Sequence, residues 1–270
     1  DQEYGGHSSI HDDAMAEKLG FRAGPIEGPT HFSLFPPLLA RIWGKAWYEQ
    51  GCISSHYLNM VVEGESVRAF AELPADGATS TRVWAEKADG TPVLEASASI
   101  GPDAGPTLLE RRMAELRPPA KLLILEDLKV GMTGAQDERV RMDPDQNMGA
   151  LYPFSLNQKL AAITESSPWY SDGAASPWGR AIIPLEMLSV LFEYSSREAA
   201  FPVKGPAVGL FADQEGDLRG QVGGDEVVQR RRAVVGDGGP GLPVIAHRLD
   251  PVAEGEPLCP PDRRGSDDRA

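Results

Sequence analysis

Cysteine is nearly absent from this sequence, which has only Cys52 and Cys259 in 270 residues. Two cysteines are too few for a disulfide framework or a zinc site, which favours a reducing, cytoplasmic setting. Long hydrophobic runs are also missing. No apolar stretch reaches the roughly 18 residues that a membrane-spanning helix needs, and the first residues do not have the pattern of a secretory signal. We therefore expect no membrane contact.

Basic residues are in the minority, with 26 Lys and Arg against 40 Asp and Glu, which gives a net charge of -14. A surface of this sign does not favour nucleic acid as a partner. The one basic cluster, residues 230–232, lies among acidic residues and is interpreted as a solvated turn or strand edge. The hydrophobic content of 41% is sufficient for a core, and the length suits two domains of about 130 residues each.

The stretch from Gly20 to Gly51 has the clearest pattern. A loop with two Gly-Pro pairs precedes an apolar run over residues 31–48, in which large side chains recur four apart. That spacing is typical of a helix buried on several sides. The recurring residues are Leu34, Leu38 and Ile42, with Phe35, Leu39, Trp43 and Trp47 beside them. Pro36-Pro37 predicts either a kink or a helix that begins there with proline in its first turn.

Residues 56–100 alternate between apolar and polar positions, which is typical of strands. Asp89-Gly90 predicts a hairpin turn. The predicted strands cover residues 56–62, 67–73, 81–85 and 93–100. One long helix followed by antiparallel strands is the hot-dog arrangement, an α+β fold in which a sheet wraps around a helix. We expect one such unit over residues 1–101.

The second half repeats this order more weakly. A linker at 102–121, with an amphipathic helix at 107–117, leads to a second unit predicted at 122–247. Its expected elements are a strand at 138–142, helices at 154–164 and 185–194, and strands at 227–235 and 242–246. An ordered internal repeat of this kind predicts two fused copies of one fold, a double hot-dog whose two sheets are continuous.

The composition changes near the C-terminus. From Glu215 onward there is no Phe, Trp, Tyr or Lys, while eight Arg, ten Gly and six Pro occur. We therefore expect the second unit to be incomplete or divergent after residue 215, and residues 248–270 to be a disordered, irregular tail that buries too little apolar surface to fold. A shift of reading frame near Gly216 is the alternative explanation, which sequencing of the locus would test.

The segment at residues 4–13 resembles the signature of MaoC-like hydratases and dehydratases, in which an Asp, an Asn-Pro pair, an apolar residue and a His are followed by a further Asp. Ile10, His11 and Asp13 match the end of that signature. The short helix at 14–20, the loop with Pro25-Ile26 and Gly28, and the long helix follow in the family's order. The resemblance covers residues 4–101 and, more faintly, 138–213. It implies a hot-dog fold and addition or removal of water at a 2-enoyl or 3-hydroxyacyl thioester.

The resemblance also implies roles for individual residues. His11 would be the base, His7 or Glu27 would take the place of the acid, and the Gly28 amide would face the thioester oxygen as enolate charge develops. Asp13, Glu165 and Tyr170 would contact the substrate. No metal or redox cofactor is expected. Coenzyme A or an acyl-carrier arm would arrive as part of the substrate, and a homodimer is expected.

The sequence departs from the family's pattern at several positions. Gly6 stands at the position of the acidic residue, Ser8-Ser9 replaces Asn-Pro, and Glu27 replaces the histidine of the loop. In the second copy Glu165 keeps the acid, while Tyr170 replaces the histidine. Two alternatives therefore stay open: a protein that binds an acyl or polyketide group, or acts as a scaffold, without turnover, and a hot-dog thioesterase that uses Glu165 or Glu27.

Overall fold

The computed structural model describes most of the N-terminal half and shorter parts of the rest. The described residues are 10–102, 104–117, 125–132, 138–140, 144–145, 154–163, 165–187, 202, 204–205, 212–218, 229–237 and 243–251. His7, the predicted helix beyond residue 187 and the tail beyond residue 251 lie outside these ranges.

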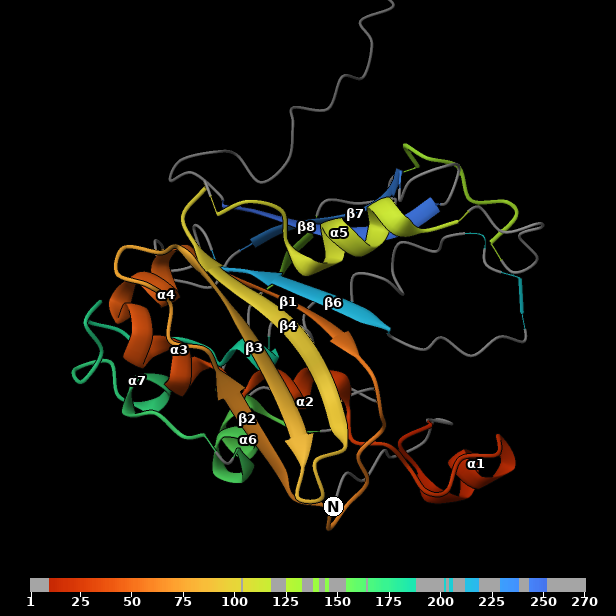
Figure 1. The fold of residues 1–270 in the computed structure, drawn as a ribbon, viewed down its shortest axis with the longest axis horizontal. Helices are drawn as coiled ribbons and strands as arrows, with labels where there is room; N and C mark the ends of the chain where they lie inside the picture. Colours follow the sequence, from red (N-terminus) through yellow and green to blue (C-terminus); the bar gives the residue numbers. More distant parts are fainter. Residues whose placement is uncertain are drawn as a thin grey trace, which may run out of the picture.

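The N-terminal half folds as an antiparallel sheet with helices against one face. Its elements are α1 (Asp13–Lys18), α2 (Gly28–Phe32), α3 (Pro36–Trp43), α4 (Lys45–Gln50), β1 (Gly51–Tyr57), β2 (Val67–Ala71), β3 (Ser80–Lys87) and β4 (Pro92–Ile100). The strands are ordered β2-β3-β4-β1-β6, and each neighbouring pair is antiparallel. Figure 1 shows α2, α3 and α4 on one side of this sheet and α5 (Leu108–Glu115) on the other. The predicted α+β hot-dog arrangement is confirmed for this half.

The core lies between the helices and the concave face of the sheet. Phe32, Leu39 and Trp47 come from the helices, Phe35 is the N-cap of α3, and all four are almost completely buried. The strands contribute apolar residues at alternate positions, namely Ile53, Val83, Ala85, Leu94, Ala96 and Ala98. Burial of large apolar side chains supplies the main stabilisation of such a layer.

The predicted long helix is divided into three. α3 begins with Pro36 at its first position, which is one of the two predicted alternatives, because proline needs no amide partner there. Gly44 separates α3 from α4 with a φ of 59°, a conformation that side-chain-bearing residues rarely adopt. The apolar periodicity crosses both breaks, so the sequence pattern predicts the buried face better than the helix ends.

Strands β2, β3 and β4 agree with the prediction to within a few residues, whereas β1 begins five residues earlier than the predicted 56 and ends at Tyr57. Residues 51–55 are all buried, because the helices cover one face of β1 and α5 covers the other. A strand covered on both faces shows no polar alternation, which explains the missed start.

The second half contributes α6 (Leu156–Ala162), α7 (Pro168–Ser171) and β6 (Asp213–Asp217) around the first sheet, and β5 (Glu138–Val140), β7 (Gln229–Asp237) and β8 (Pro243–Pro251) as a separate sheet ordered β5-β7-β8. β8 runs to Pro251, past the residue at which we expected the irregular tail to begin.

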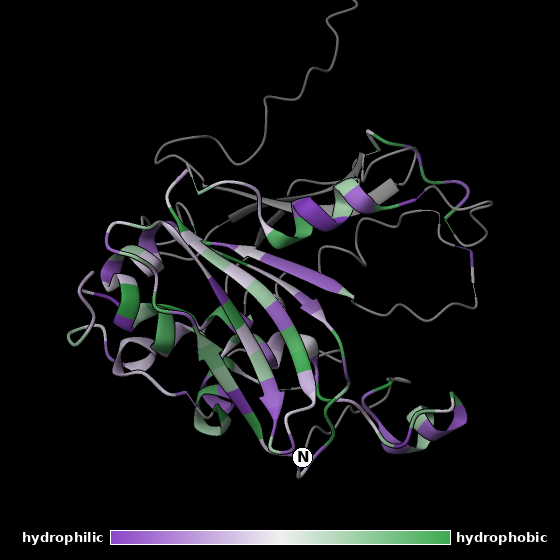
Figure 2. Cartoon of the chain, in the orientation of Figure 1, coloured by the Kyte–Doolittle hydropathy of each residue, from purple (hydrophilic) through white to green (hydrophobic). Residues whose placement is uncertain are grey.

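The two halves share one sheet through β6, which pairs with β1 over Cys52–His56. Gly216 stands opposite Ile53, and Leu218 is buried in the core. The sequence did not predict this strand because residues 213–217 contain no apolar side chain, as their hydrophilic colour in Figure 2 shows. No helix in the described ranges is long and apolar enough to cross a bilayer.

Candidate functional site

The segment carrying His11 and Asp13 packs against the loop before α2. Asp12 caps α1 by accepting a hydrogen bond from the Met15 amide. The Asp13 carboxylate accepts one from the Gly24 amide at 2.7 Å, and His11 Nδ1 lies 2.6 Å from the Pro25 carbonyl oxygen. A Cβ on Gly24 would lie 2.3 Å from the His11 carbonyl oxygen. Glycine is therefore required at 24 for the two segments to meet.

The contact with Pro25 decides which nitrogen of His11 carries the proton. A carbonyl oxygen only accepts hydrogen bonds, so Nδ1 must be the protonated nitrogen, and Nε2 carries the lone pair of the neutral ring. A carboxylate often fixes an imidazole in this way, and here a backbone carbonyl does so. The arrangement orients the ring and keeps Nε2 as the basic atom.

Glu27 and Gly28 form the start of α2. Glu27 is the N-cap residue and is 5% exposed. Gly28 lies under the ring of Tyr57, which a Cβ at position 28 would approach to 2.8 Å. Pro29 has no amide N–H, so Gly28 supplies the one amide of the first two positions of α2. Position 28 must therefore be glycine for Tyr57 to pack against it.

Tyr57 is held in place from the second half of the chain. Its hydroxyl donates a hydrogen bond to Gln214 Oε1 at 2.7 Å, on β6. Burial raises the pKa of the Tyr57 hydroxyl above its usual value, so it stays a neutral donor. The β1–β6 pairing thereby positions the residue that covers Gly28.

The structure brings Glu165 and Tyr170 together with the helices of the first half. Ser33 Oγ, just after α2, donates a hydrogen bond to Glu165 Oε2 at 3.3 Å. Tyr170 is buried, and its pKa is raised by that burial, by its interactions with Tyr48, including a side-chain hydrogen bond, and by the charge of Glu165. These two residues therefore lie at the seam between the halves, at the other end of α2 from Gly28.

Two contacts at this seam were not predicted from the sequence. Glu186 is 4% exposed, forms an ion pair with Lys159 Nζ at 2.7 Å, and accepts a hydrogen bond from Thr30 on α2. Tyr48, Trp169 and Trp178 pack edge-to-face with ring centroids 5.2–5.8 Å apart. The contacts Thr30–Glu186, Tyr48–Trp169 and Tyr48–Trp178 join residues more than 100 positions apart, and no local pattern predicts such pairings.

Comparison with known proteins found similarity to solved structures. No protein-family model and no curated protein matches the sequence. A protein assigned as a MaoC domain dehydratase, from Chloroflexus aurantiacus, matches with a TM-score of 0.47 and 14% identity over 86% of this chain and 73% of that chain. A conserved hypothetical protein of Mycobacterium tuberculosis, described as a double hotdog fold, matches with a TM-score of 0.40 and 11% identity over 85% and 82%.

A third match is the full-length peroxisomal multifunctional enzyme type 2 of Drosophila melanogaster, with a TM-score of 0.35 and 14% identity. The match covers 82% of this chain and 40% of that chain. All three matches have TM-scores below 0.5, so the hot-dog description of this chain rests on its own helices and strands. The roles of His11, Asp13, Glu27, Gly28, Glu165 and Tyr170 stay predictions. Within the described ranges, no group of three or more His, Cys, Asp or Glu side chains could hold a metal ion.

Burial strongly opposes the protonation of His31, on α2. It is 7% exposed, and burial lowers its pKa from 6.5 to about 4. The unfolded chain therefore binds more protons than the folded chain between these values. The stabilisation is complete above pH 6.5 and is lost as the pH falls toward 4.

We expect protonation linked to His31 to lower the free energy of unfolding by about 2 kcal/mol as the pH falls from about 7 to 5. Urea unfolding of the wild type and of His31→Phe at both pH values measures the effect, because the variant keeps the apolar volume without the titration. The decrease should be smaller in the variant by that amount. An equal decrease in the two proteins would contradict the assignment to His31.

Proposed function

We propose that the chain is a MaoC-like hydro-lyase that adds water to, or removes it from, an acyl thioester. The observation that carries the proposal is the 2.6 Å contact between His11 Nδ1 and the Pro25 carbonyl oxygen. It orients an imidazole beside the loop that leads into α2, with Nε2 as the basic atom. A positioned base of this type is what hydration of an enoyl thioester requires.

In the proposed reaction, His11 Nε2 takes a proton from water as the water oxygen bonds to the β-carbon of the enoyl thioester. The electrons of the double bond move toward the thioester carbonyl, whose oxygen becomes negative. The Gly28 amide would donate a hydrogen bond to that oxygen. The α-carbon then takes a proton from the imidazolium, or from the carboxylic acid form of Glu27, to which the imidazolium passes its own proton. Either route gives the 3-hydroxyacyl thioester and restores the starting protonation of both side chains. Dehydration is the reverse sequence.

Acyl binding without turnover is the second candidate, and a specific observation favours it. Asp13, the further Asp at the end of the matched signature, uses its carboxylate to hold the Gly24 amide, and Gly6 stands at the position of the signature's acidic residue. A carboxylate committed to such a contact serves the local structure. In this case the protein would bind the acyl group and release it unchanged.

Incubation of the purified protein with crotonyl-CoA and with a longer 2-enoyl-CoA distinguishes these functions. Loss of the ultraviolet absorbance of the conjugated thioester, with a 3-hydroxyacyl product found by mass spectrometry, is the expected result. Release of free thiol would instead indicate a thioesterase that uses Glu165 or Glu27. Binding detected by calorimetry without either product would overturn the hydro-lyase proposal in favour of the acyl-binding one.

A further inference from the structure

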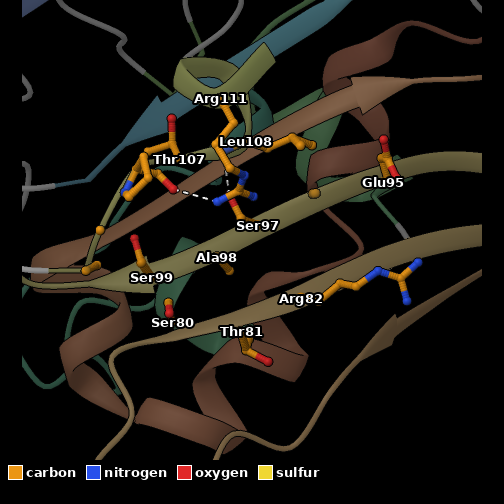
Figure 3. Close-up of a pocket in the computed structure, with 14 residues that line it drawn as sticks. Ser80, Thr81, Arg82, Glu95, Ser97, Ala98, Ser99, Thr107, Leu108 and Arg111 are labelled. Carbon is orange, nitrogen blue, oxygen red and sulfur yellow. Dashed lines mark hydrogen bonds between the residues drawn. The ribbon is translucent and has the colours of Figure 1, made fainter. Parts of the chain in front are cut away.

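A second candidate binding site lies on the outer face of the sheet, away from the helices α2 to α4. A groove of about 340 Å³ runs between β3, β4 and the chain leading into α5. Figure 3 shows its floor of small side chains, with residues 104–108 along one side. None of the residues predicted to act in thioester chemistry lines this groove. The volume is in the range of small-molecule sites, about 300–1,000 Å³.

The floor of the groove follows from strand alternation. Val83, Ala85, Ala96 and Ala98 point into the core, so their neighbours point outward. On the outer face Ser80 pairs with Ser99, and Arg82 pairs with Ser97. Serine at three of these four positions leaves a hollow where larger side chains would fill the space, and it lines the hollow with hydroxyl groups.

The wall of the groove is fixed to the floor. The Leu108 amide donates a hydrogen bond to Ser97 Oγ at 2.9 Å, and the Leu109 amide donates one to Ser54 Oγ at 2.8 Å. A capping box between Thr107 and Glu110 satisfies the next amide. The amides at the start of α5 are therefore already used, and a ligand must be held by side chains.

The side chains available are cationic in an otherwise acidic protein. The charged residues that line the groove are Arg82, Arg111 and Glu95, a local sum of +1 in a chain of net charge -14. Arg111 Nη1 donates to the Pro106 carbonyl oxygen at 2.7 Å, which holds the guanidinium over the floor near Ser97 (Figure 3). Arg82 extends along the sheet, lies over the Trp84 ring at 4.6 Å and forms an exposed ion pair with Glu72 at 3.7 Å, so Arg111 is the main cation of the groove. The positive end of the α5 dipole adds to the same potential.

From these contacts we propose that the groove binds a small phosphorylated molecule, with its phosphate on Arg111. The planar guanidinium presents several donors in a fixed geometry that fits phosphate oxygens, and one contact to Pro106 leaves the others for the ligand. The hydroxyls of Ser99 and Thr107 complete the polar surroundings. Arg82 contributes a weaker attraction from the far side of the floor, because Glu72 partly neutralises its charge. The proposal is independent of the thioester reaction.

Isothermal titration with inorganic phosphate, at an ionic strength held constant with chloride, tests the site in the full-length protein. The wild type should bind phosphate. Arg111→Gln should weaken binding by about tenfold or more, because it removes a charge-assisted hydrogen bond. Arg82→Gln should weaken it by about threefold, the effect of a half-exposed charge without direct contact. Arg68→Gln, at an exposed position on β2, is the matched control and should bind as the wild type does.

Two further variants keep the test decisive. Arg111→Lys keeps the charge without the planar fork, so intermediate affinity supports direct guanidinium contact. Ser99→Leu fills the floor and should abolish binding even if Arg111→Gln does not fold, with folding followed by circular dichroism. No detectable phosphate binding to the wild type overturns the proposal. Equal losses in Arg111→Gln and Arg68→Gln, or unchanged binding in Ser99→Leu, also overturn it.

Discussion

Replacement of His11 by alanine is expected to lower kcat/KM for enoyl-CoA hydration by about 10²–10⁴-fold, the usual contribution of a positioned acid–base group. The structure supports this size of effect because Pro25 orients the ring and leaves Nε2 as its basic nitrogen. His11→Asn tests the base more directly. Asparagine keeps an N–H group that can donate to Pro25 but has no basic atom, so this variant should lose as much activity as His11→Ala. Its midpoint of urea unfolding should be closer to that of the wild type.

His56→Ala is the matched control for this prediction. His56 also places Nδ1 near a backbone carbonyl, that of Ala212 at 3.0 Å, and lies 3.1 Å from Asp213. His56 and its carboxylate partner lie on the sheet face that α5 covers. A search for an Asp/His pair alone would select this pair. We expect its loss to leave kcat/KM within about twofold of the wild type per folded molecule. A larger loss in His56→Ala than in His11→Ala would contradict the assignment of the base.

The fold of the first half could be predicted because its pattern is local. Strands β2 to β4 have one buried and one solvated face, so their residues alternate, and glycine-containing turns separate them. The sequence carried no such signal for β6. Its five residues are polar or glycine, and they join the sheet because β1 has an open edge for backbone pairing and because Leu218 reaches the core just beyond them. Pairing of this kind depends on the partner strand.

The candidate site divides in the same way. The resemblance to MaoC-like proteins selected His11 and Asp13 as candidates and predicted only that the loop before α2 follows them in the chain, whereas the structure shows both in contact with that loop. It could not predict that Tyr57, held by Gln214, covers Gly28. It also could not predict that α2 receives contacts from Glu165 and Glu186. Those contacts join residues more than 130 positions apart, and only the packing of the two halves creates them.

The ion pair Lys159–Glu186 lies within the second half, and Glu186 also accepts a hydrogen bond from Thr30 of the first half. It is expected to be the most sensitive polar contact at the seam. Lys159→Met should lower the free energy of unfolding by about 3–5 kcal/mol, because it leaves a carboxylate that is 5% exposed without its cation. Glu186→Leu should cost less, about 1–3 kcal/mol. The Lys159 side chain is 16% exposed and can extend its ammonium group toward water when the carboxylate is gone.

The double variant Lys159→Met with Glu186→Leu tests whether the ion pair adds net stability at the seam or only offsets the desolvation of its own two charges. Two well-packed apolar side chains avoid the desolvation of both charges, so the double variant should unfold within about 1 kcal/mol of the wild type. Urea unfolding of the four proteins measures the coupling. Lys45→Met, which removes a half-exposed partner of Glu49 on α4, is the control and should leave stability nearly unchanged. Additive losses in the double variant would show that each side chain stabilises the seam through separate contacts.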